Sequence, residues 1–307
     1  MNTQSNAMTG PSIRSQGTPA AVSATQAMYW SIRRELWENR SIYLAPLVAA
    51  ALFLFGFAIS MLSMRHRITA SPLDSSQQPD LLATRYELSA ALIMGTALIV
   101  GIFYSLDALY GERRDRSILF WKSLSVSDLT AVLSKLTVPL VILPLLSFAI
   151  SLATQFIMLL LSSVILLGSG VSIAALWTQV SFFHVSFVLL YHLLTVHGLW
   201  YAPLYGWLLL VSAWAPRAPF IWAVLPPFVI CGVEKIAFNT SYFLALLQER
   251  LVGQGDAMAS LSAPNDFMAT LIPELHFFRT PGLWIGLALA AAFLAAAVRL
   301  RRYQGPI

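Results

Sequence analysis

Long apolar stretches separated by short polar breaks run along almost the whole chain. About 20 apolar residues carry a helix across the hydrocarbon core of a bilayer. Six stretches approach or exceed that length, at residues 43–64, 87–109, 129–167, 180–213, 220–238 and 283–298. The pattern predicts an all-α polytopic membrane protein with six transmembrane helices.

Two of the six stretches are longer than one straightforward crossing. A helix over 129–167 would be about 58 Å long, against a hydrocarbon core of about 30 Å. Pro139 and Pro144 favour a single kinked helix there, because no polar turn residues mark a hairpin. The stretch 180–213 is also long, so eight spans are the alternative to six, with the same orientation.

Two polar segments are predicted to lie on the outer side of the membrane. Residues 65–86 contain Pro72 and Pro79, which predict a non-helical loop. Residues 239–280 form a longer external segment, in which 241–252 has the half-apolar pattern of an interfacial or re-entrant helix.

The N-terminal region has two parts of different character. Residues 1–27 are rich in Ser, Thr, Gln, Ala and Gly and predict a disordered cytoplasmic tail. Residues 28–41 place apolar side chains near one side and charged ones elsewhere, which is typical of a helix in the plane of the headgroups. Residues 28–302 then form a single transmembrane domain, followed by a cytoplasmic tail at 303–307.

Composition excludes a soluble enzyme. Of the 307 residues, 58% are hydrophobic and only 11% are charged, whereas soluble domains have about 25% charged residues. The net charge of +5 is explained by topology, since an N-in, C-in arrangement puts 13 of the 19 basic residues on the cytoplasmic side. No nucleic-acid partner is needed to account for it.

Aromatic residues near the ends of the predicted spans read mostly as an interfacial belt. They are Tyr29, Trp30, Trp37, Tyr43, Trp177, Trp200, Trp214 and Trp284. The single cysteine, Cys231, excludes an intrachain disulfide and is expected to be a small buried apolar residue.

A strongly charged segment at 111–128 interrupts the apolar pattern. Its first residues include Glu112, Arg113, Arg114, Asp115 and Arg116. A central Arg or Asp costs about 2.5 to 3.5 kcal/mol on insertion scales, so the segment must lie in water or at the interface. Its basic content predicts a cytoplasmic loop.

Apolar residues at helical spacing follow the charged ones. Ile118, Trp121 and Leu124 recur at i, i+3 and i+6, and the two apolar residues after Ile118 widen the stripe. Ser117 is the candidate N-cap of this amphipathic helix. The helix either anchors the topology at the membrane surface or docks into an apolar and charged groove of a soluble partner.

Residues 109–128, LYGERRDRSILFWKSLSVSD, resemble the first cytoplasmic loop of ABC-2 type transporter permeases. The resemblance implies that 112–125 is a coupling helix seated in a cleft of an ATPase subunit, and that 28–41 is an elbow helix. Ser125 stands where many relatives have proline, which leaves the docking role in place.

The resemblance also implies a function. The chain would be the permease subunit of an ATP-driven exporter in the bacterial inner membrane, working as a homodimer or with a similar permease and with two copies of the ATPase. The 307 residues contain no G-x-x-x-x-G-K-[ST] motif. ATP and Mg²⁺ would therefore be bound by the partner, and this chain would be neither an enzyme nor a cofactor carrier. The transported substrate is not specified by the sequence.

The resemblance assigns ATPase-docking roles to eight residues of the loop. Ionic contacts are expected from Glu112, Arg113, Arg114, Asp115 and Arg116, and groove-filling contacts from Phe120, Trp121 and Leu124.

A second set of polar residues lies within the predicted spans. His184, His192, His197 and Glu234 are candidates for a polar substrate path, because ionisable groups inside membranes are often functional. Hydrogen-bonded histidines inside the bundle and a snorkelling Glu234 are the structural alternatives. An intramembrane enzyme built on these groups, or a channel or transporter driven by an ion gradient, is the alternative function. No H-E-x-x-H motif occurs, so no metal site is predicted.

Overall fold

The computed structural model describes residues 24–70, 78–123, 126–165, 190, 198–252 and 280–307. These residues are mainly helical, and no β-strand occurs in the ranges described. Five helices among them are long and apolar enough to cross a membrane, judged by length and composition. The all-α prediction is confirmed. Half of the predicted span 180–213 lies outside the described residues.

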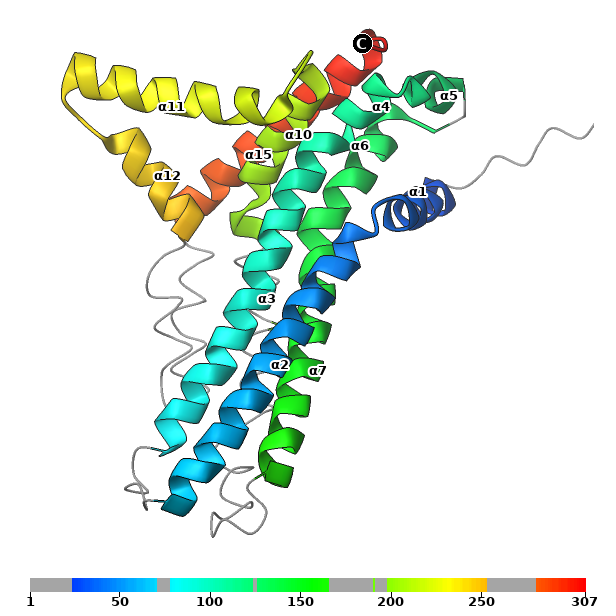
Figure 1. Ribbon diagram of the computed structural model, residues 1–307. Coiled ribbons are helices and arrows are strands. Elements are labelled where there is room, and N and C mark those ends of the chain that lie inside the picture. The colour runs from blue at the N-terminus through cyan, green and yellow to red at the C-terminus, as the bar shows by residue number, and fades with distance from the viewer. Residues whose placement is uncertain (1–23, 71–77, 124–125, 166–189, 191–197, 253–279) are drawn as a thin grey trace, which may run out of the picture.

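Three long helices run side by side and form the main bundle (Figure 1). They are α2 (Ser41–Ala70), α3 (Gln78–Ala108) and α7 (Leu143–Ile165). Phe57 and Met61 of α2 pack with Tyr86 of α3 and Met158 of α7. Large apolar side chains such as Phe55 also point outward, as expected of helices that are hydrophobic all round.

The long apolar stretch after the charged loop is one continuous helical run over 128–165. It consists of α6 (Asp128–Thr137), a π-helical turn η1 (Val138–Ile142) and α7. Pro139 lies in the π-turn, where the wider turn accommodates a residue that has no backbone N–H to donate. The prediction of a single helix instead of a hairpin is confirmed for residues 128–165, whereas the predicted kink stays a prediction.

The prediction of a non-helical loop at 65–86 is wrong, because helices extend into the segment from both ends. Helix α2 continues to Ala70, and α3 begins at Gln78, so only residues 71–77 lie outside the description. Pro79 is the second residue of α3. A proline is tolerated in the first helical turn because its missing N–H would have no intrahelical partner there.

Helices α10 (Ala202–Trp214) and α15 (Pro281–Tyr303) pack closely against each other. Gly206 makes the approach possible, because a Cβ at this position would lie 3.3 Å from the carbonyl oxygen of Ala290. Helix α15 also packs against α6, which brings the end of the chain next to the charged loop (Figure 1).

Helices α11 (Pro219–Phe238) and α12 (Tyr242–Val252) project from the bundle and return to it (Figure 1). Ala218 and Asn239, both with left-handed backbone angles, flank α11. Helix α11 has the length and composition of a span, as the sequence predicts, but few of its side chains are buried. The helix predicted at 241–252 is confirmed by α12.

Helix α1 (Ala24–Glu38) lies crosswise to α2 at one end of the bundle (Figure 1). It begins four residues before the predicted segment 28–41 and ends at Glu38, where the chain turns into α2 through a hydrogen bond from Asn39 N to Glu35 O of 3.0 Å. One face of α1 packs against α6.

Candidate functional site

The charged loop folds as two short helices and not as one helix over 112–125. They are α4 (Tyr110–Arg114) and α5 (Ser117–Ser123). Arg116 separates them with a left-handed backbone (φ 60°) that an α-helix cannot continue through. Ser117 is the first residue of α5 and not its N-cap, and its hydroxyl donates to Glu112 O at 3.5 Å. Leu124 lies outside the described residues.

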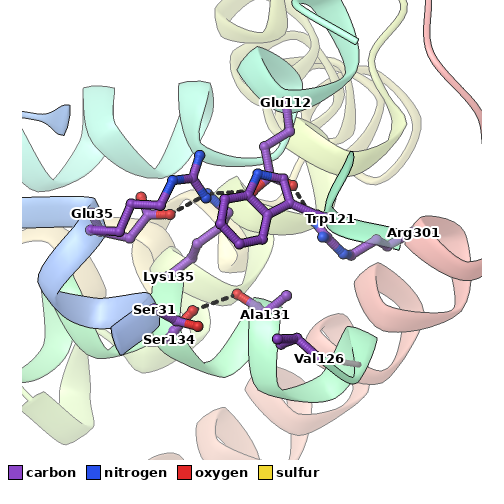
Figure 2. Close-up of a pocket in the computed structure, with 10 residues that line it drawn as sticks. Ser31, Glu35, Glu112, Trp121, Val126, Ala131, Ser134, Lys135 and Arg301 are labelled. Carbon is purple, nitrogen blue, oxygen red and sulfur yellow. Dashed lines mark hydrogen bonds and ion pairs between the residues drawn. The ribbon is translucent and has the colours of Figure 1, made fainter. Parts of the chain in front are cut away.

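Glu112 of α4 points inward into a buried cluster of charges (Figure 2). Lys135 of α6, only 3% exposed, places its Nζ 3.2 Å from Glu112 Oε1 and 2.8 Å from Glu35 Oε1. The other oxygen of Glu35 accepts a hydrogen bond of 2.8 Å from the hydroxyl of Tyr104. One ammonium group thus joins the carboxylates of α1 and α4.

Arg301 of α15 closes the cluster from the other side (Figure 2). Its Nη1 pairs with Glu112 Oε2, and its Nε lies 3.2 Å from Oδ1 of Asp128 at the start of α6. Glu112 therefore binds a lysine with one oxygen and an arginine with the other. These charges hold together α15, the loop helix α4 and the start of α6.

The cluster contains more carboxylates than cations. Buried ion pairs add little net stability, because desolvation offsets their attraction, but removing one partner costs about 3 to 5 kcal/mol. The arrangement therefore acts mainly as a specific fastening of α1, α3, α4, α6 and α15 in one relative position. A cavity of about 20 Å³ adjoins it, which is room for about one water molecule.

Trp121 links α5 to α1. The guanidinium carbon of Arg34 lies 3.8 Å from the centroid of the Trp121 ring, and such stacking contributes about 0.5 to 2 kcal/mol. Arg34 also pairs with Glu38 at 2.9 Å. Trp121, predicted to fill a partner's groove, is half-buried by a contact within its own chain.

Arg113 also points inward and fastens α4 to α10. Its Nη1 donates to the carbonyl oxygens of Ala213 at 2.6 Å and Ala215 at 3.3 Å, where α10 ends. Ser212 Oγ accepts from the backbone N–H groups of Leu109 and Tyr110 at 3.0 and 2.9 Å. These bonds satisfy backbone groups that helix ends leave unpaired.

The remaining loop side chains form an outward surface, which we call the loop surface. It comprises Arg114, Asp115, Arg116, Leu119 and Phe120, all exposed. Phe120 is 61% and Leu119 56% exposed. Arg114 pairs with Asp115 at 3.0 Å. Two apolar side chains beside three charged ones have the chemistry of a protein-docking patch.

The C-terminal residues support the loop from behind. Lys122 Nζ donates to Gln304 O at 3.0 Å and to Arg302 O at 3.3 Å, near the end of α15. Ile307 N donates to Arg113 O at 3.3 Å. A basic side chain at a helix C-terminus is favourable because the last carbonyl groups carry partial negative charge.

The predicted substrate path is not assembled among the described residues. His184, His192 and His197 lie outside them. Glu234 caps α12: its Oε1 accepts from Tyr242 N at 2.6 Å, and its Oε2 accepts from Phe243 N at 2.9 Å. In the part of the chain that the structure covers, no group of three His, Cys, Asp or Glu side chains could hold a metal ion.

The far end of α12 is held by Arg250. Its guanidinium carbon lies 3.9 Å from the ring centroid of Trp200, and Nη1 donates to Trp200 O at 3.2 Å. Nη2 donates to Gly282 O. Burial lowers the pKa of Arg250, but an arginine stays charged at neutral pH. Trp200, expected in the interfacial belt, is only 3% exposed.

Sequence reasoning found Glu112 but not its partners. Lys135 lies inside the predicted span 129–167, and an ionisable residue within an apolar stretch is a signal that could have singled it out. Glu35 and Arg301 sit in ordinary charged surroundings at the two ends of the chain. Only the packing of α1 and α15 against α6 brings them together.

The fold and the site define a class: a helical protein whose described residues include five apolar helices of membrane-spanning length, compatible with a multi-pass membrane protein. Compared with models of known families, with curated proteins and with solved structures, the chain has no match. The resemblance of residues 109–128 to a permease loop therefore stays a prediction.

Proposed function

We propose that the chain is the membrane-spanning subunit of an ATP-driven exporter, in which a separate ATPase docks on the loop surface. The observation that carries the proposal is the two-sided loop. Its inner side is fixed by Glu112 and Arg113, while its outer side exposes Arg114 and Phe120. A patch that must receive force from a partner needs this combination of rigid support and open contact area.

The buried cluster gives the docking proposal a mechanical basis. When ATP closes the paired ATPases, the loop moves with them, and the bundle shifts between two packed arrangements. Chain connectivity carries the movement into α3 and α6. The pairs Lys135–Glu35 and Arg301–Glu112 carry it also into α1 and α15.

The complete assembly in this proposal contains two permeases, identical or similar, and two ATPases that bind ATP and Mg²⁺. The permease crosses a bacterial inner membrane with six helices, with the N-terminus, the loop and the C-terminus in the cytoplasm. The basic residues around 113–116 and 299–302 favour that orientation. The substrate class is left open.

The test is co-purification of the ATPase with a variant of the loop surface. Arg114→Glu with Phe120→Ala reverses one exposed charge and removes the largest exposed ring on α5. We expect at least a tenfold loss of ATPase recovered with the permease, because interface hot spots cost about 2 kcal/mol or more each. Membrane insertion is expected to be unchanged.

Arg217→Glu with Phe238→Ala is the matched control. It makes the same chemical changes at two exposed positions outside the loop surface, one just before α11 and one at its last residue. The control should retain the ATPase. Full recovery of the ATPase by the Arg114–Phe120 variant would show that the loop surface is not the docking site.

A further inference from the structure

The outward face of α1 carries an arginine held between two tryptophans. The guanidinium carbon of Arg33 lies 5.2 Å from the ring centroid of Trp30 and 5.1 Å from that of Trp37. Trp37 is 71% exposed and Trp30 52%. Tyr29 packs edge-on against Trp30. This group, Tyr29, Trp30, Arg33 and Trp37, is called the aromatic–arginine face.

The aromatic–arginine face is opposite to the face that anchors α1. Successive residues of an α-helix are about 100° apart, so Arg33 and Trp37 both lie about 160° from Glu35. Glu35 is buried against Lys135 of α6. One face of α1 is thus fixed to the bundle, while the aromatic–arginine face is open.

The two glutamates of α1 form ion pairs within the chain, whereas two arginines in and just after α1 do not. Glu35 pairs with Lys135, and Glu38 with Arg34. Arg33 and Arg40 are exposed and have no ion-pair partner among the residues that the structure describes. The open side of α1 therefore presents positive charge flanked by indoles.

We propose that the aromatic–arginine face binds the headgroups of anionic phospholipids. Arginine donates planar, paired hydrogen bonds that suit phosphate oxygens, and tryptophan favours the boundary between headgroups and acyl chains. Helix α1 lies crosswise to α2 at the end of the bundle (Figure 1), the orientation in which its length follows a membrane surface.

Charge complementarity selects an anionic lipid as the occupant. A basic side chain near a negatively charged leaflet contributes about 1 kcal/mol, equivalent to about a fivefold change in affinity. The two indoles add contact area that does not depend on lipid charge. The inference does not depend on an ATPase, so it can fail while the docking proposal stands.

The experiment uses the full chain, purified in detergent and stripped of lipid. It is titrated with dioleoylphosphatidylglycerol or dioleoylphosphatidylcholine, and bound lipid is counted by native mass spectrometry. We expect the wild-type chain to prefer the anionic lipid and to lose that preference as ionic strength rises. Equal binding of the two lipids at low salt would overturn the proposal.

Three variants sharpen the test. Arg33→Gln should weaken binding of the anionic lipid about fivefold and weaken binding of the zwitterionic lipid, which has a headgroup phosphate but no net charge, by a smaller factor. Trp30→Ala with Trp37→Ala should weaken both lipids. Arg217→Gln, the matched control, removes an exposed arginine outside α1 and should change neither.

Two outcomes of the variant series contradict the inference. If the Arg33→Gln variant binds the anionic lipid as tightly as the wild-type chain does, Arg33 has no part in binding. An equal loss in Arg217→Gln would show that net charge, and not this face, attracts the lipid. Because Arg33 is exposed, the Arg33→Gln variant should have the same melting temperature as the wild-type chain. The salt dependence of lipid binding by the wild-type chain tests the proposal independently of any variant.

Discussion

Lys135 is the residue on which the buried cluster depends. It is fully enclosed, and its ammonium group is the only cation within ion-pairing distance of Glu35 among the described residues. It also shares Glu112 with Arg301. Without Lys135, Glu35 would be left buried with only the hydroxyl of Tyr104 as a side-chain partner.

Replacing Lys135 by methionine keeps most of the side-chain length and removes the charge. We expect the free energy of unfolding to fall by about 3 to 5 kcal/mol, because a carboxylate remains buried without its cation. The fall is measured as a lower melting temperature of the purified chain in detergent.

Lys235→Met serves as the control for this prediction. Lys235 is exposed near the end of α11 and has no ion pair among the described residues, so the same substitution should change stability by less than about 0.5 kcal/mol. Adding Glu35→Gln to Lys135→Met should recover part of the loss. Equal melting temperatures for Lys135→Met and the wild-type chain would mean that the cluster does not fasten the helices.

At the scale of elements, the junction between α3, α4 and α10 gives the loop its shape. Helix α3 ends at Ala108, and the next two backbone N–H groups donate to Ser212 of α10. Arg113 then reaches the carbonyl groups at the end of α10. These contacts fix α4 at the end of α3, and the left-handed backbone of Arg116 then separates α4 from α5.

Ser212→Ala tests this junction. The substitution removes the acceptor of two backbone N–H groups, and we expect a loss of about 1 to 3 kcal/mol, the cost of leaving buried donors unsatisfied. Thermal unfolding in detergent reports the change, and faster hydrogen exchange at residues 109–114 localises it.

Ser105→Ala is the corresponding control. Ser105 is equally buried, but its hydroxyl donates to Gly101 O of its own helix at 2.7 Å, so its removal leaves no N–H group without a partner. A loss in Ser105→Ala as large as that in Ser212→Ala would assign the effect to packing and not to the junction.

At the scale of the whole molecule, the loop, α1 and the C-terminal residues gather at one end of the bundle (Figure 1). Residue 307 reaches residue 113 through a backbone hydrogen bond of 3.3 Å. Whatever side of a membrane the loop occupies, the C-terminus occupies the same side. The positive-inside rule makes that side the cytoplasm in our proposal.

Site-directed labelling tests whether the loop and the C-terminal residues lie on the same side of the membrane. In a Cys231→Ser background, Asp115→Cys and Tyr303→Cys introduce single thiols at exposed positions. An impermeant maleimide should label both from the cytoplasmic side only, as seen by comparing inverted with right-side-out vesicles. Labelling of the two positions from opposite sides would contradict the fold, and labelling of both from outside would contradict the orientation.

The sequence by itself determined the helical class and several of the long helices. Apolar length is a local property, so the helices around 43–64, 87–109 and 220–238 could be predicted from it. The continuous run through Pro139 could also be predicted, because no residues suited to a turn interrupt it. The prediction of a loop at 65–86 was wrong, because a helix can continue into polar sequence when its backbone hydrogen bonds are satisfied within the helix.

Only the tertiary structure decided which charges of the loop face inward. Glu112 and Arg113 are next to Arg114 in sequence, yet they bind Lys135 and the end of α10, while Arg114 faces outward. A charged side chain pays the cost of desolvation only where a distant segment supplies its counter-charge or carbonyl groups. Those partners come from residues about 20 to 190 positions away, which no local pattern encodes.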